Sequence, residues 1–426
     1  MIIVDTALKK RQDEGNPIRV AMVGAGYMGR GIALQIEKYI TGMRLVAISN
    51  RTISEAQRAY SDAGIDESVT VENANQLNEA IAQNRYAVTD NPLLLCEADG
   101  VEAIIEATGH VELSAHVAMK AIEHKKHLIL MNAELDATVG PILKVYADQA
   151  GIVIANADGD QPGVMMNLYR FVKTIGYNPV LVGNIKGLQD YYRTPETQKA
   201  FAAANNITPK MATSFADGTK ISMENAVVAN ATGFGVGRRG MYGPRCKHVN
   251  ESVNLFPMQD FLKGGVVDYI LGAEPGPGVF VIGHNDHPER KPYMQYFKMG
   301  DGPFYTFYVP YHLPHLEVPL TVARAVLFND AAVAPIGGPV CDVITIAKKD
   351  LAAGDVIDGI GGFACYGIIE NYTVSRSQKL LPMGLAEDCR LIRAIPKDQA
   401  ITLDDVEMPE GRLCDKLRNE QDSYSF

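Results

Sequence analysis

Short apolar runs alternate with helix-like segments along the first third of the chain. The runs have the length of buried strands, and the segments between them carry apolar side chains at helical spacing. Strands that alternate with helices in this way predict a parallel sheet covered on both faces. We therefore predict a Rossmann-type, doubly wound α/β domain over residues 1–157. The predicted strands are 19–23, 45–48, 101–109, 127–131 and 152–155, and the predicted helices include 30–39, 111–123 and 141–150.

The pattern changes beyond this domain. A helix is predicted at 165–175 and a strand at 180–187, followed by short strands at 278–282, 304–309 and 311–315 that suggest an antiparallel sheet, then a helix at 318–328. Gly337, Gly338 and Pro339 interrupt the pattern, and residues 347–357 and 395–406 then repeat a strand, a polar turn and an apolar segment. These changes predict an α+β domain at 158–335 and a small β-rich domain at 336–426.

Composition narrows the class of protein. The 426 residues are 47% hydrophobic and carry a formal net charge of -10, without a stripe of Lys or Arg. Nucleic-acid or membrane-surface binding therefore has no electrostatic support, and a small-molecule partner is expected. The six scattered cysteines indicate reduced thiols, and neither a signal peptide nor a membrane span is evident. We expect a cytoplasmic protein.

A glycine fingerprint follows the first predicted strand. Gly24-Ala25-Gly26-Tyr27-Met28-Gly29 has the G-x-G-x-x-G spacing and leads directly into a predicted helix. In this context Gly24 permits a tight turn, Gly26 lets the backbone approach a pyrophosphate, and Gly29 lets the helix pack on the strand. The alternative is a glycine-rich turn in another kind of α/β protein. The strand-turn-helix context favours dinucleotide binding by these six residues.

The end of the second strand bears on the form of the cofactor. An NAD site usually has an acidic residue here for the ribose hydroxyls, whereas this chain has Asn50 and Arg51. A neutral amide and a permanently charged guanidinium favour NADPH over NADH. Arg51 could instead be a solvated loop residue.

Two later strand ends should face the same ligand, because ligands of open α/β sheets lie beyond the carboxyl ends of the strands. We expect Glu134 to line the nicotinamide half, although it could equally sit in the first turn of the next helix. The other residues expected there are Ala107, Thr108, Gly109 and Asn132.

Polar residues after the fifth strand are candidates for the substrate. Asp160 and Gln161 lie in a loop of the kind that carries binding residues, although Asp160 could simply cap a helix with Pro162 in its first turn. Lys186 ends an apolar strand and is a catalytic candidate, because a fixed cation can stabilise a developing alkoxide. Most lysines at strand ends are merely solvated.

The densest polar stretch is 214–225. Asp217, Lys220 and Glu224 fall at helical spacings in a segment rich in Ala, Val and Met, so one buried face could present all three charges. Surface salt bridges are the alternative reading. Ser214 and Asn230 lie in the same stretch or near the same face and are substrate-binding candidates.

Further candidates for an anionic substrate follow. Arg238 and Arg239 lie in a glycine-rich segment, and an exposed basic loop is the alternative. Arg193 and His312 are also substrate-binding candidates. The close pairs among His284, His287, His312 and His315 lack a helical metal-binding frame, so the identity of any metal stays unknown.

The chain resembles the bacterial 1-deoxy-D-xylulose 5-phosphate reductoisomerase-like (DRL) oxidoreductases, whose first domain is similar to that of homoserine dehydrogenase. The resemblance covers nearly the whole chain, and the C-terminal repeat looks like the SAF domain of those proteins. It is carried by GAGYMG, by IIEATG at 104–109, by Asn132, by GDQPG at 159–163, by SFADGTK at 214–220 and by VANATG at 228–233.

The resemblance implies an NADPH-dependent enzyme of isoprenoid biosynthesis that converts 1-deoxy-D-xylulose 5-phosphate to 2-C-methyl-D-erythritol 4-phosphate, or reduces a related carbonyl compound. It implies a homodimer built through residues 158–335. Lys186 and Lys220 would stabilise substrate oxygens, and Asp217 and Glu224 would orient them or move a proton. Arg193, or Arg238 with Arg239, would hold a phosphate.

The metal requirement and two alternative functions stay open. Classical reductoisomerases use a divalent metal held by carboxylates, but no carboxylate cluster in this sequence is specific enough to assign one. A homoserine- or sugar-acid-type dehydrogenase is the nearest rival enzyme. A nucleotide-sensing protein without turnover is the rival of a different class.

Overall fold

The computed structural model describes residues 3–426, which form two compact units. Unit 1 contains the chain up to Asp160 together with Leu313–Ala334 and Leu413–Tyr424. Unit 2 contains Gln161–His312, Pro335–Arg412 and Ser425–Phe426. Each unit is therefore assembled from segments that are far apart in the sequence.

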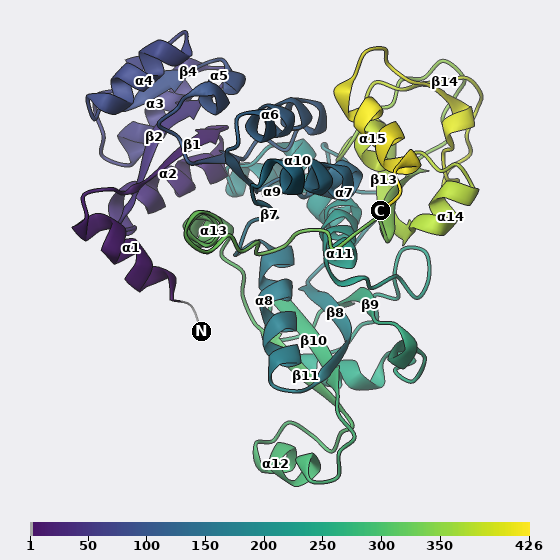
Figure 1. Ribbon diagram of the computed structural model, residues 1–426. Coiled ribbons are helices and arrows are strands. Elements are labelled where there is room, and N and C mark those ends of the chain that lie inside the picture. The colour runs from purple at the N-terminus through teal and green to yellow at the C-terminus, as the bar shows by residue number, and fades with distance from the viewer. Residues whose placement is uncertain (1–2) are drawn as a thin grey trace. The chain divides into compact units, whose positions relative to one another are not determined.

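Unit 1 is built on a seven-stranded sheet in the order β3-β4-β2-β1-β5-β6-β7 (Figure 1). Every neighbouring pair is parallel. The predicted Rossmann-type fold is thereby confirmed. The strands are β1 (Ile18–Val23), β2 (Met43–Ser49), β3 (Val69–Thr70), β4 (Ala87–Thr89), β5 (Ala103–Glu106), β6 (His127–Leu130) and β7 (Ile154–Asn156).

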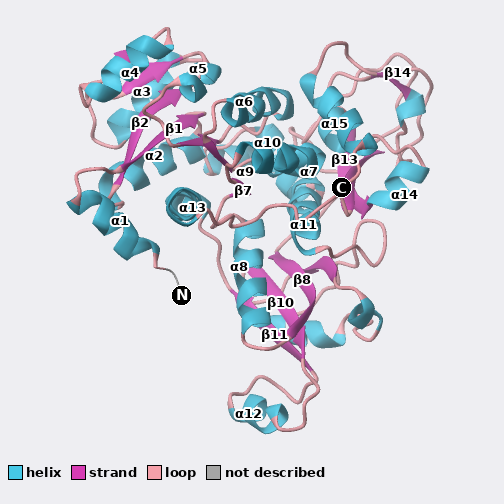
Figure 2. Cartoon of the chain, in the orientation of Figure 1, coloured by secondary structure: helices cyan, strands magenta, loops and turns pink. Residues whose placement is uncertain are grey.

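Helices connect and cover these strands (Figure 2). Their apolar faces complete one core, to which α1 contributes Val4 and Leu8 and α13 contributes Val318 and Val322. The helices of unit 1 are α1 (Val4–Asp13), α2 (Tyr27–Tyr39), α3 (Ile53–Asp62), α4 (Ala74–Ala82), α5 (Pro92–Glu97), α6 (Val111–Glu123), α7 (Ala133–Ala150), α13 (Pro314–Phe328) and α15 (Leu413–Ser423).

Three helices begin earlier than predicted. Helix α7 starts at Ala133 rather than at 141, because the Asn132 side chain accepts a hydrogen bond from the Leu135 N–H and caps the helix, and Pro141 lies inside it. Helix α8 (Gln161–Thr174) starts at Gln161 rather than at 165. Helix α13 starts at Pro314, where the fixed φ of proline suits the first helical position.

Unit 2 contains a four-stranded sheet in the order β11-β10-β8-β9. The strands are β8 (Asn178–Lys186), β9 (Val266–Leu271), β10 (Gly278–His284) and β11 (Phe304–Val309). Strand β10 runs antiparallel to β8 and β11, but β9 runs parallel to β8. The predicted antiparallel sheet is therefore a mixed sheet, because a long connection through α11 (Thr219–Thr232) reverses the chain before β9. Residues 311–315 form no strand, since α13 begins there.

Helices α8 and α11 pack on this sheet, and the short helix α12 (Arg290–Tyr296) lies beyond the ends of β10 and β11 (Figure 2). Antiparallel strands β12 (Cys341–Ala347) and β13 (Cys365–Asn371) also pack against α11. The remaining elements of unit 2 are α9 (Lys199–Ala204), α10 (Pro209–Ala216), η1 (Val249–Asn254), η2 (Asp260–Lys263), α14 (Tyr372–Ser377), η3 (Met383–Leu385), β14 (Arg390–Leu391), η4 (Leu403–Asp405) and β15 (Val406–Glu407).

None of the helices in residues 3–426 is both long enough and apolar enough to span a bilayer.

Candidate functional site

The turn between β1 and α2 has the features that a dinucleotide-binding turn requires. Gly24 has a φ of 105°, and a β carbon on it would lie 2.9 Å from the Ala107 carbonyl oxygen. A β carbon on Gly29 would collide with the Gly24 carbonyl oxygen. At Gly26, by contrast, a β carbon would meet no described atom within 4 Å. Close packing therefore explains why Gly24 and Gly29 are glycines. Gly26 instead leaves open space at the N-terminus of α2, where a pyrophosphate would bind.

The side chain of Asn50 supports this turn from the end of β2. Its Oδ1 accepts a hydrogen bond of 3.2 Å from the Ala25 N–H, and its Nδ2 donates to the Thr52 carbonyl oxygen at 2.9 Å. The neighbouring Arg51 is exposed and makes no hydrogen bond or ion pair with the rest of residues 3–426. Tyr27 and Met28 form the first residues of α2. The structure thus places these predicted cofactor residues at one edge of the sheet.

The ends of β5 and β6 carry a buried polar network. The Glu106 carboxylate accepts hydrogen bonds from the N–H and the hydroxyl of Thr108, between Ala107 and Gly109. Asn132 donates from Nδ2 to the Ser114 hydroxyl at 2.9 Å. Burial raises the pKa of Glu106, although the Thr108 donors oppose that shift.

Glu134 lies buried in the first turn of α7, where a carboxylate complements the helix dipole. This placement agrees with the structural alternative for Glu134. Its role beside a nicotinamide stays a prediction.

A buried polar cluster in unit 2 brings together three of the predicted site residues. Lys186, at the end of β8, donates from Nζ to Glu224 Oε2 on α11 at 3.3 Å. The Glu224 side chain is 5% exposed and that of Lys186 is 20% exposed, so the lysine side chain is partly exposed and that of the glutamate is buried. Gln161, the first residue of α8, joins them through Asn184 on β8. Three elements therefore fix the position of one ammonium group.

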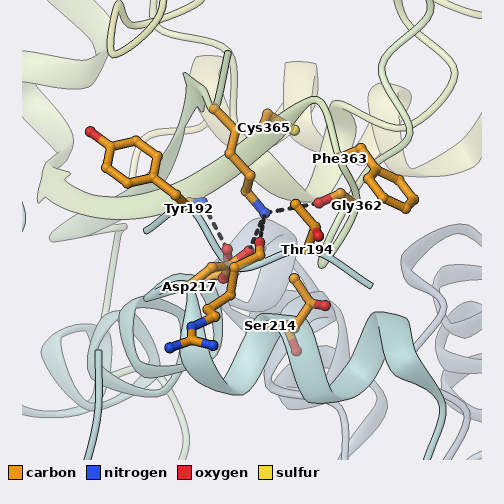
Figure 3. Close-up of polar contacts among 12 residues, drawn as sticks. Tyr192, Thr194, Ser214, Asp217, Gly362, Phe363 and Cys365 are labelled. Carbon is orange, nitrogen blue, oxygen red and sulfur yellow. Dashed lines mark hydrogen bonds and ion pairs between the residues drawn. The ribbon is translucent and has the colours of Figure 1, made fainter. Parts of the chain in front are cut away.

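Asp217 belongs to a different cluster from the one predicted. It follows α10 rather than lying in α11, so it does not share a helical face with Lys220 and Glu224. Its carboxylate pairs with Lys348 at 2.9 Å, and the same ammonium donates to the carbonyl oxygens of Arg193 and Gly362, each at 2.8 Å. In Figure 3 the Asp217 carboxylate and the Gly362 carbonyl point toward one nitrogen.

All three protons of the Lys348 ammonium have acceptors, and the pair is almost fully buried. Burial raises the pKa of Asp217, and the charge of Lys348 opposes that shift. The arrangement ties together four separate segments of unit 2. Lys220 occupies the first turn of α11, one turn before Glu224.

The predicted phosphate-binding arginines contact other protein groups. Arg193 donates to Asp190 at 3.0 Å, and Arg238 donates to the carbonyl oxygens of Met241 and Tyr242 while lying over the Tyr242 ring. Arg239 donates to Glu370 at 2.7 Å and to Gln378 at 2.6 Å. None of these contacts links an arginine to the Lys186–Glu224 pair.

The remaining substrate candidates are also placed. Ser214 donates to the Met211 carbonyl within α10, and Asn230 Oδ1 accepts from the main chain of Val340 at 2.8 Å, next to β12. His312 is half-buried at the end of a segment of unit 2, and Asp160 is buried immediately before α8. The roles of these residues in substrate binding stay predictions.

Sequence reasoning missed Asn184, Asn225 and Lys348 as members of these clusters. Asn184 could have been noticed as the polar residue inside an otherwise apolar strand, two positions before Lys186. Lys348 gave no such indication, because its carboxylate partner is 131 residues away. Within residues 3–426, no group of three or more His, Cys, Asp and Glu side chains could hold a metal ion.

Part of the chain is similar to a known protein family. Residues 159–318 match the family described as oxidoreductase DRL, catalytic domain. No curated protein sequence matches the chain.

Solved structures with some similarity include a probable dehydrogenase from Thermotoga maritima, with 12% identity, a TM-score of 0.41 and coverage of 75% of this chain and 91% of that one. The myo-inositol dehydrogenase of Lactobacillus casei, in complex with NAD(H) and myo-inositol, has 14% identity, a TM-score of 0.37 and coverage of 70% and 75%. An NAD-binding oxidoreductase from Klebsiella pneumoniae has 16% identity, a TM-score of 0.30 and coverage of 41% of this chain. The chain spans only 44% of the length of that oxidoreductase. Similarity at this level identifies neither a substrate nor a cofactor form.

The segment that matches the DRL catalytic domain contains Gln161, Asn184, Lys186 and Glu224. Unit 1 supplies a parallel sheet with a glycine fingerprint. The chain therefore contains both a segment similar to an oxidoreductase catalytic domain and a Rossmann-type sheet.

Proposed function

We propose that the chain is an NADPH-dependent reductase or reductoisomerase that acts on a small polyhydroxylated or phosphorylated carbonyl compound. The observation that carries this proposal is the Lys186–Glu224 pair, inside the segment that matches the DRL catalytic domain. A buried carboxylate that holds a partly exposed ammonium is suited to binding an oxygen on which negative charge develops.

Each residue of the pair has a distinct task in this proposal. The bound dinucleotide supplies a hydride to the carbonyl carbon. Lys186 donates a hydrogen bond from Nζ to the carbonyl oxygen and can transfer a proton to the alkoxide as it forms. Glu224 Oε2 fixes the position of the ammonium from its buried side. In the oxidative direction the same lysine would accept the proton of the alcohol.

The preference for NADPH rests on Asn50 and Arg51. Both ends of the Asn50 side-chain amide form hydrogen bonds that hold the turn. Because this residue is an amide and not a carboxylate, it would not repel a 2′-phosphate. Arg51 is exposed and its guanidinium could pair with that phosphate through two hydrogen bonds. Gly24, Gly26 and Gly29 would accommodate the pyrophosphate of either cofactor form.

Titration of NADPH and NADH, followed by cofactor fluorescence, tests this preference. We expect NADPH to bind at least tenfold more tightly, and Arg51→Ala to remove most of that difference while leaving NADH affinity unchanged. Gly26→Ala should weaken both cofactors without lowering the melting temperature, because its β carbon meets no described protein atom. Equal affinities for NADPH and NADH in the unmodified protein would contradict the proposal.

A substrate screen with NADPH tests the activity itself. Ketose phosphates including 1-deoxy-D-xylulose 5-phosphate, aldoses, and sugar acids in the oxidative direction cover the candidate classes. Lys186→Met should lower kcat at least 100-fold and leave NADPH affinity unchanged. Lys199→Met is the matched control, because the side chain of Lys199 is 65% exposed and lies on another helix of unit 2. Tight NADPH binding without turnover of any substrate would instead favour a nucleotide-sensing protein.

A second candidate, a dehydrogenase for an unphosphorylated polyhydroxylated substrate such as a sugar acid, is favoured by one observation. Arg193, Arg238 and Arg239 each contact other protein groups. The Lys186–Glu224 pair is instead linked to side-chain amides, because Asn184 donates to Glu224 and is itself hydrogen-bonded to Gln161 and Asn225. A phosphorylated and an unphosphorylated form of the same sugar, compared by kcat/KM, distinguish the two candidates.

Three further expectations belong to this proposal. A role in isoprenoid biosynthesis follows only if 1-deoxy-D-xylulose 5-phosphate is turned over, and a SAF-like function of residues 336–426 and a homodimer rest on the resemblance to DRL oxidoreductases. Sedimentation equilibrium of the purified protein would test the dimer directly.

A further inference from the structure

Strand β8 presents Asn184 and Lys186 on the same face, because side chains two positions apart on a strand point the same way. The Asn184 side chain is fully buried. Its Nδ2 donates to Gln161 Oε1 at 2.8 Å and to Glu224 Oε2 at 3.2 Å. Its Oδ1 accepts a hydrogen bond of 2.6 Å from Asn225 Nδ2. One carboxamide therefore contacts α8 and two consecutive residues of α11.

The orientation of this carboxamide is fixed by its surroundings. Reversing Asn184 alone would direct its oxygen at the Glu224 carboxylate. Reversing its amide neighbours as well would direct the Gln161 oxygen at the Gly278 carbonyl and the Asn225 oxygen at the Ile221 carbonyl. The acceptor oxygens of Glu224, Gly278 and Ile221 thus determine the orientation of all three side-chain amides.

Two donors meet on a single oxygen of Glu224. Asn184 Nδ2 and Lys186 Nζ both donate to Oε2, from positions two residues apart on the same face of β8. A carboxylate held by one donor can rotate about its χ angles, whereas a second donor from a rigid strand restricts that rotation. The direction in which Lys186 points therefore depends on Asn184 as well as on Glu224.

We infer that Asn184 is a positioning residue for Lys186. It holds Glu224 Oε2 in place, and Glu224 in turn fixes the ammonium that would bind the substrate oxygen. This inference rests on the proposed function of the Lys186–Glu224 pair. Misplacement of a reacting group by about 1 Å can cost on the order of 100-fold in rate, so loss of Asn184 should affect kcat more than KM.

The test compares two substitutions at one position with a control on the same strand. Asn184→Leu keeps the approximate volume and removes every hydrogen bond, and Asn184→Ser leaves space for a water if the first variant folds poorly. Asn178→Ala, at the exposed start of β8, is the matched control. For each variant the melting temperature and NADPH affinity establish that the protein is folded.

Two readouts separate positioning from a merely structural role. With the substrate found in the screen, Asn184→Leu should lower kcat about 100-fold with KM changed less than threefold, and Asn184→Ser should lower kcat by no more than that. With protein labelled by [ε-13C]lysine, the Lys186 resonance, assigned by its loss in Lys186→Met, should move toward the position of exposed lysines. The same movement is expected in Glu224→Gln and not in Asn178→Ala. The NMR measurement requires no substrate.

The outcomes distinguish this inference from the proposed function. If Lys186→Met keeps full activity, the proposed function fails and the inference fails with it. If Lys186→Met is inactive but folded Asn184 variants keep kcat and an unmoved Lys186 resonance, only the inference is overturned. Rescue of kcat by Asn184→Ser but not by Asn184→Leu would still support it if the resonance position follows kcat.

Discussion

Asp136 on α7 is a buried carboxyl group that is hydrogen-bonded to the neutral side chain of Asn156. The Asn156 side chain donates to Oδ2 at 2.5 Å, and Gly140, one turn later, leaves room for Oδ1 because a β carbon there would collide with it. Burial raises the pKa of Asp136 from 3.8 to about 7, which the hydrogen bond from Asn156 offsets only in part. Near neutral pH this group is therefore at its titration midpoint.

The raised pKa predicts a specific pH dependence of stability. Between pH 4 and pH 7 the folded protein keeps the Asp136 proton while the unfolded chain releases it, so this residue's contribution to the free energy of unfolding falls as pH rises, by up to about 4 kcal/mol. Asp136→Asn should remove this fall. Urea denaturation of both proteins at pH 5, 6, 7 and 8 measures the difference. Asp148→Asn, on the exposed side of α7, should leave the pH dependence unchanged.

The Lys348–Asp217 pair makes a second prediction at the scale of residues. Lys348→Met would leave Asp217 buried without its cation and should lower the free energy of unfolding by about 3–5 kcal/mol. Lys348→Met combined with Asp217→Leu should cost less than the sum of the two single substitutions, because neither charge is then isolated. Urea denaturation of the four proteins gives the coupling energy. Additive losses would show that the pair does not act as a unit.

Individual residues were predictable where the chemistry was local. Lys186 and Glu224 stood out as charges within apolar segments, and Gly24 and Gly29 as parts of a fixed motif. The partner of Asp217 was not predictable, because Lys348 reaches it only through the pairing of β12 with β13 and their packing against α11. Helical spacing placed Asp217 with Glu224, but the turn at Gly218, with a φ of 88°, separates them.

Among the elements, α7 and α15 pack against each other in unit 1. Pro141 inside α7 cannot donate to the Ala137 carbonyl. The Gln421 side chain on α15 bridges this region, since its Oε1 accepts from the Ile142 N–H at 3.2 Å and its Nε2 donates to the Thr138 carbonyl at 3.3 Å. A side-chain amide from the C-terminal helix thereby supports the helix turn that proline weakens.

We expect Gln421→Ala to lower the free energy of unfolding by about 1–3 kcal/mol, because the Ile142 N–H would lose this acceptor and the Thr138 carbonyl would lose one of its donors, keeping that from Arg418. Asn419→Ala, on the exposed face of the same helix, should change it by less than about 0.5 kcal/mol. Thermal and urea unfolding measure both. Equal effects of the two substitutions would show that Gln421 contributes only helix propensity.

Elements with strong local patterns were predicted well. Helix 111–123 coincides with α6, and each of the five strands predicted for the Rossmann-type sheet lies within a few residues of an observed strand. The start of α7 was missed because Pro141 was taken as a first helical residue, whereas the capping side chain of Asn132 lies nine positions earlier. Strand β9 was not predicted, and its parallel pairing with β8 could not be, because periodicity along a strand does not specify its partner.

At the scale of the whole molecule, the chain leaves and re-enters unit 1. Helix α13 contributes Val318, Val322 and Ala323 to the same core as β1 and β2, although the chain leaves the unit at Asp160. The Arg324 side chain on α13 also donates to the Asp158 carboxylate at 2.8 Å. The domains predicted from the sequence were each continuous in the chain, because hydrophobic periodicity contains no information about which distant helix completes a core.

This discontinuity predicts how fragments of the protein will fold. A fragment of residues 1–160 lacks α13 and should show helical circular dichroism without a cooperative thermal transition, because its core would expose the surface that Val318 and Val322 cover. Joining residues 313–334 to its C-terminus should restore cooperative unfolding. A short glycine-serine linker is sufficient, since a β carbon on Gly159 would lie 2.6 Å from the Leu313 carbonyl oxygen. If the fragment of residues 1–160 unfolds cooperatively by itself, α13 is a peripheral addition rather than part of the core of unit 1.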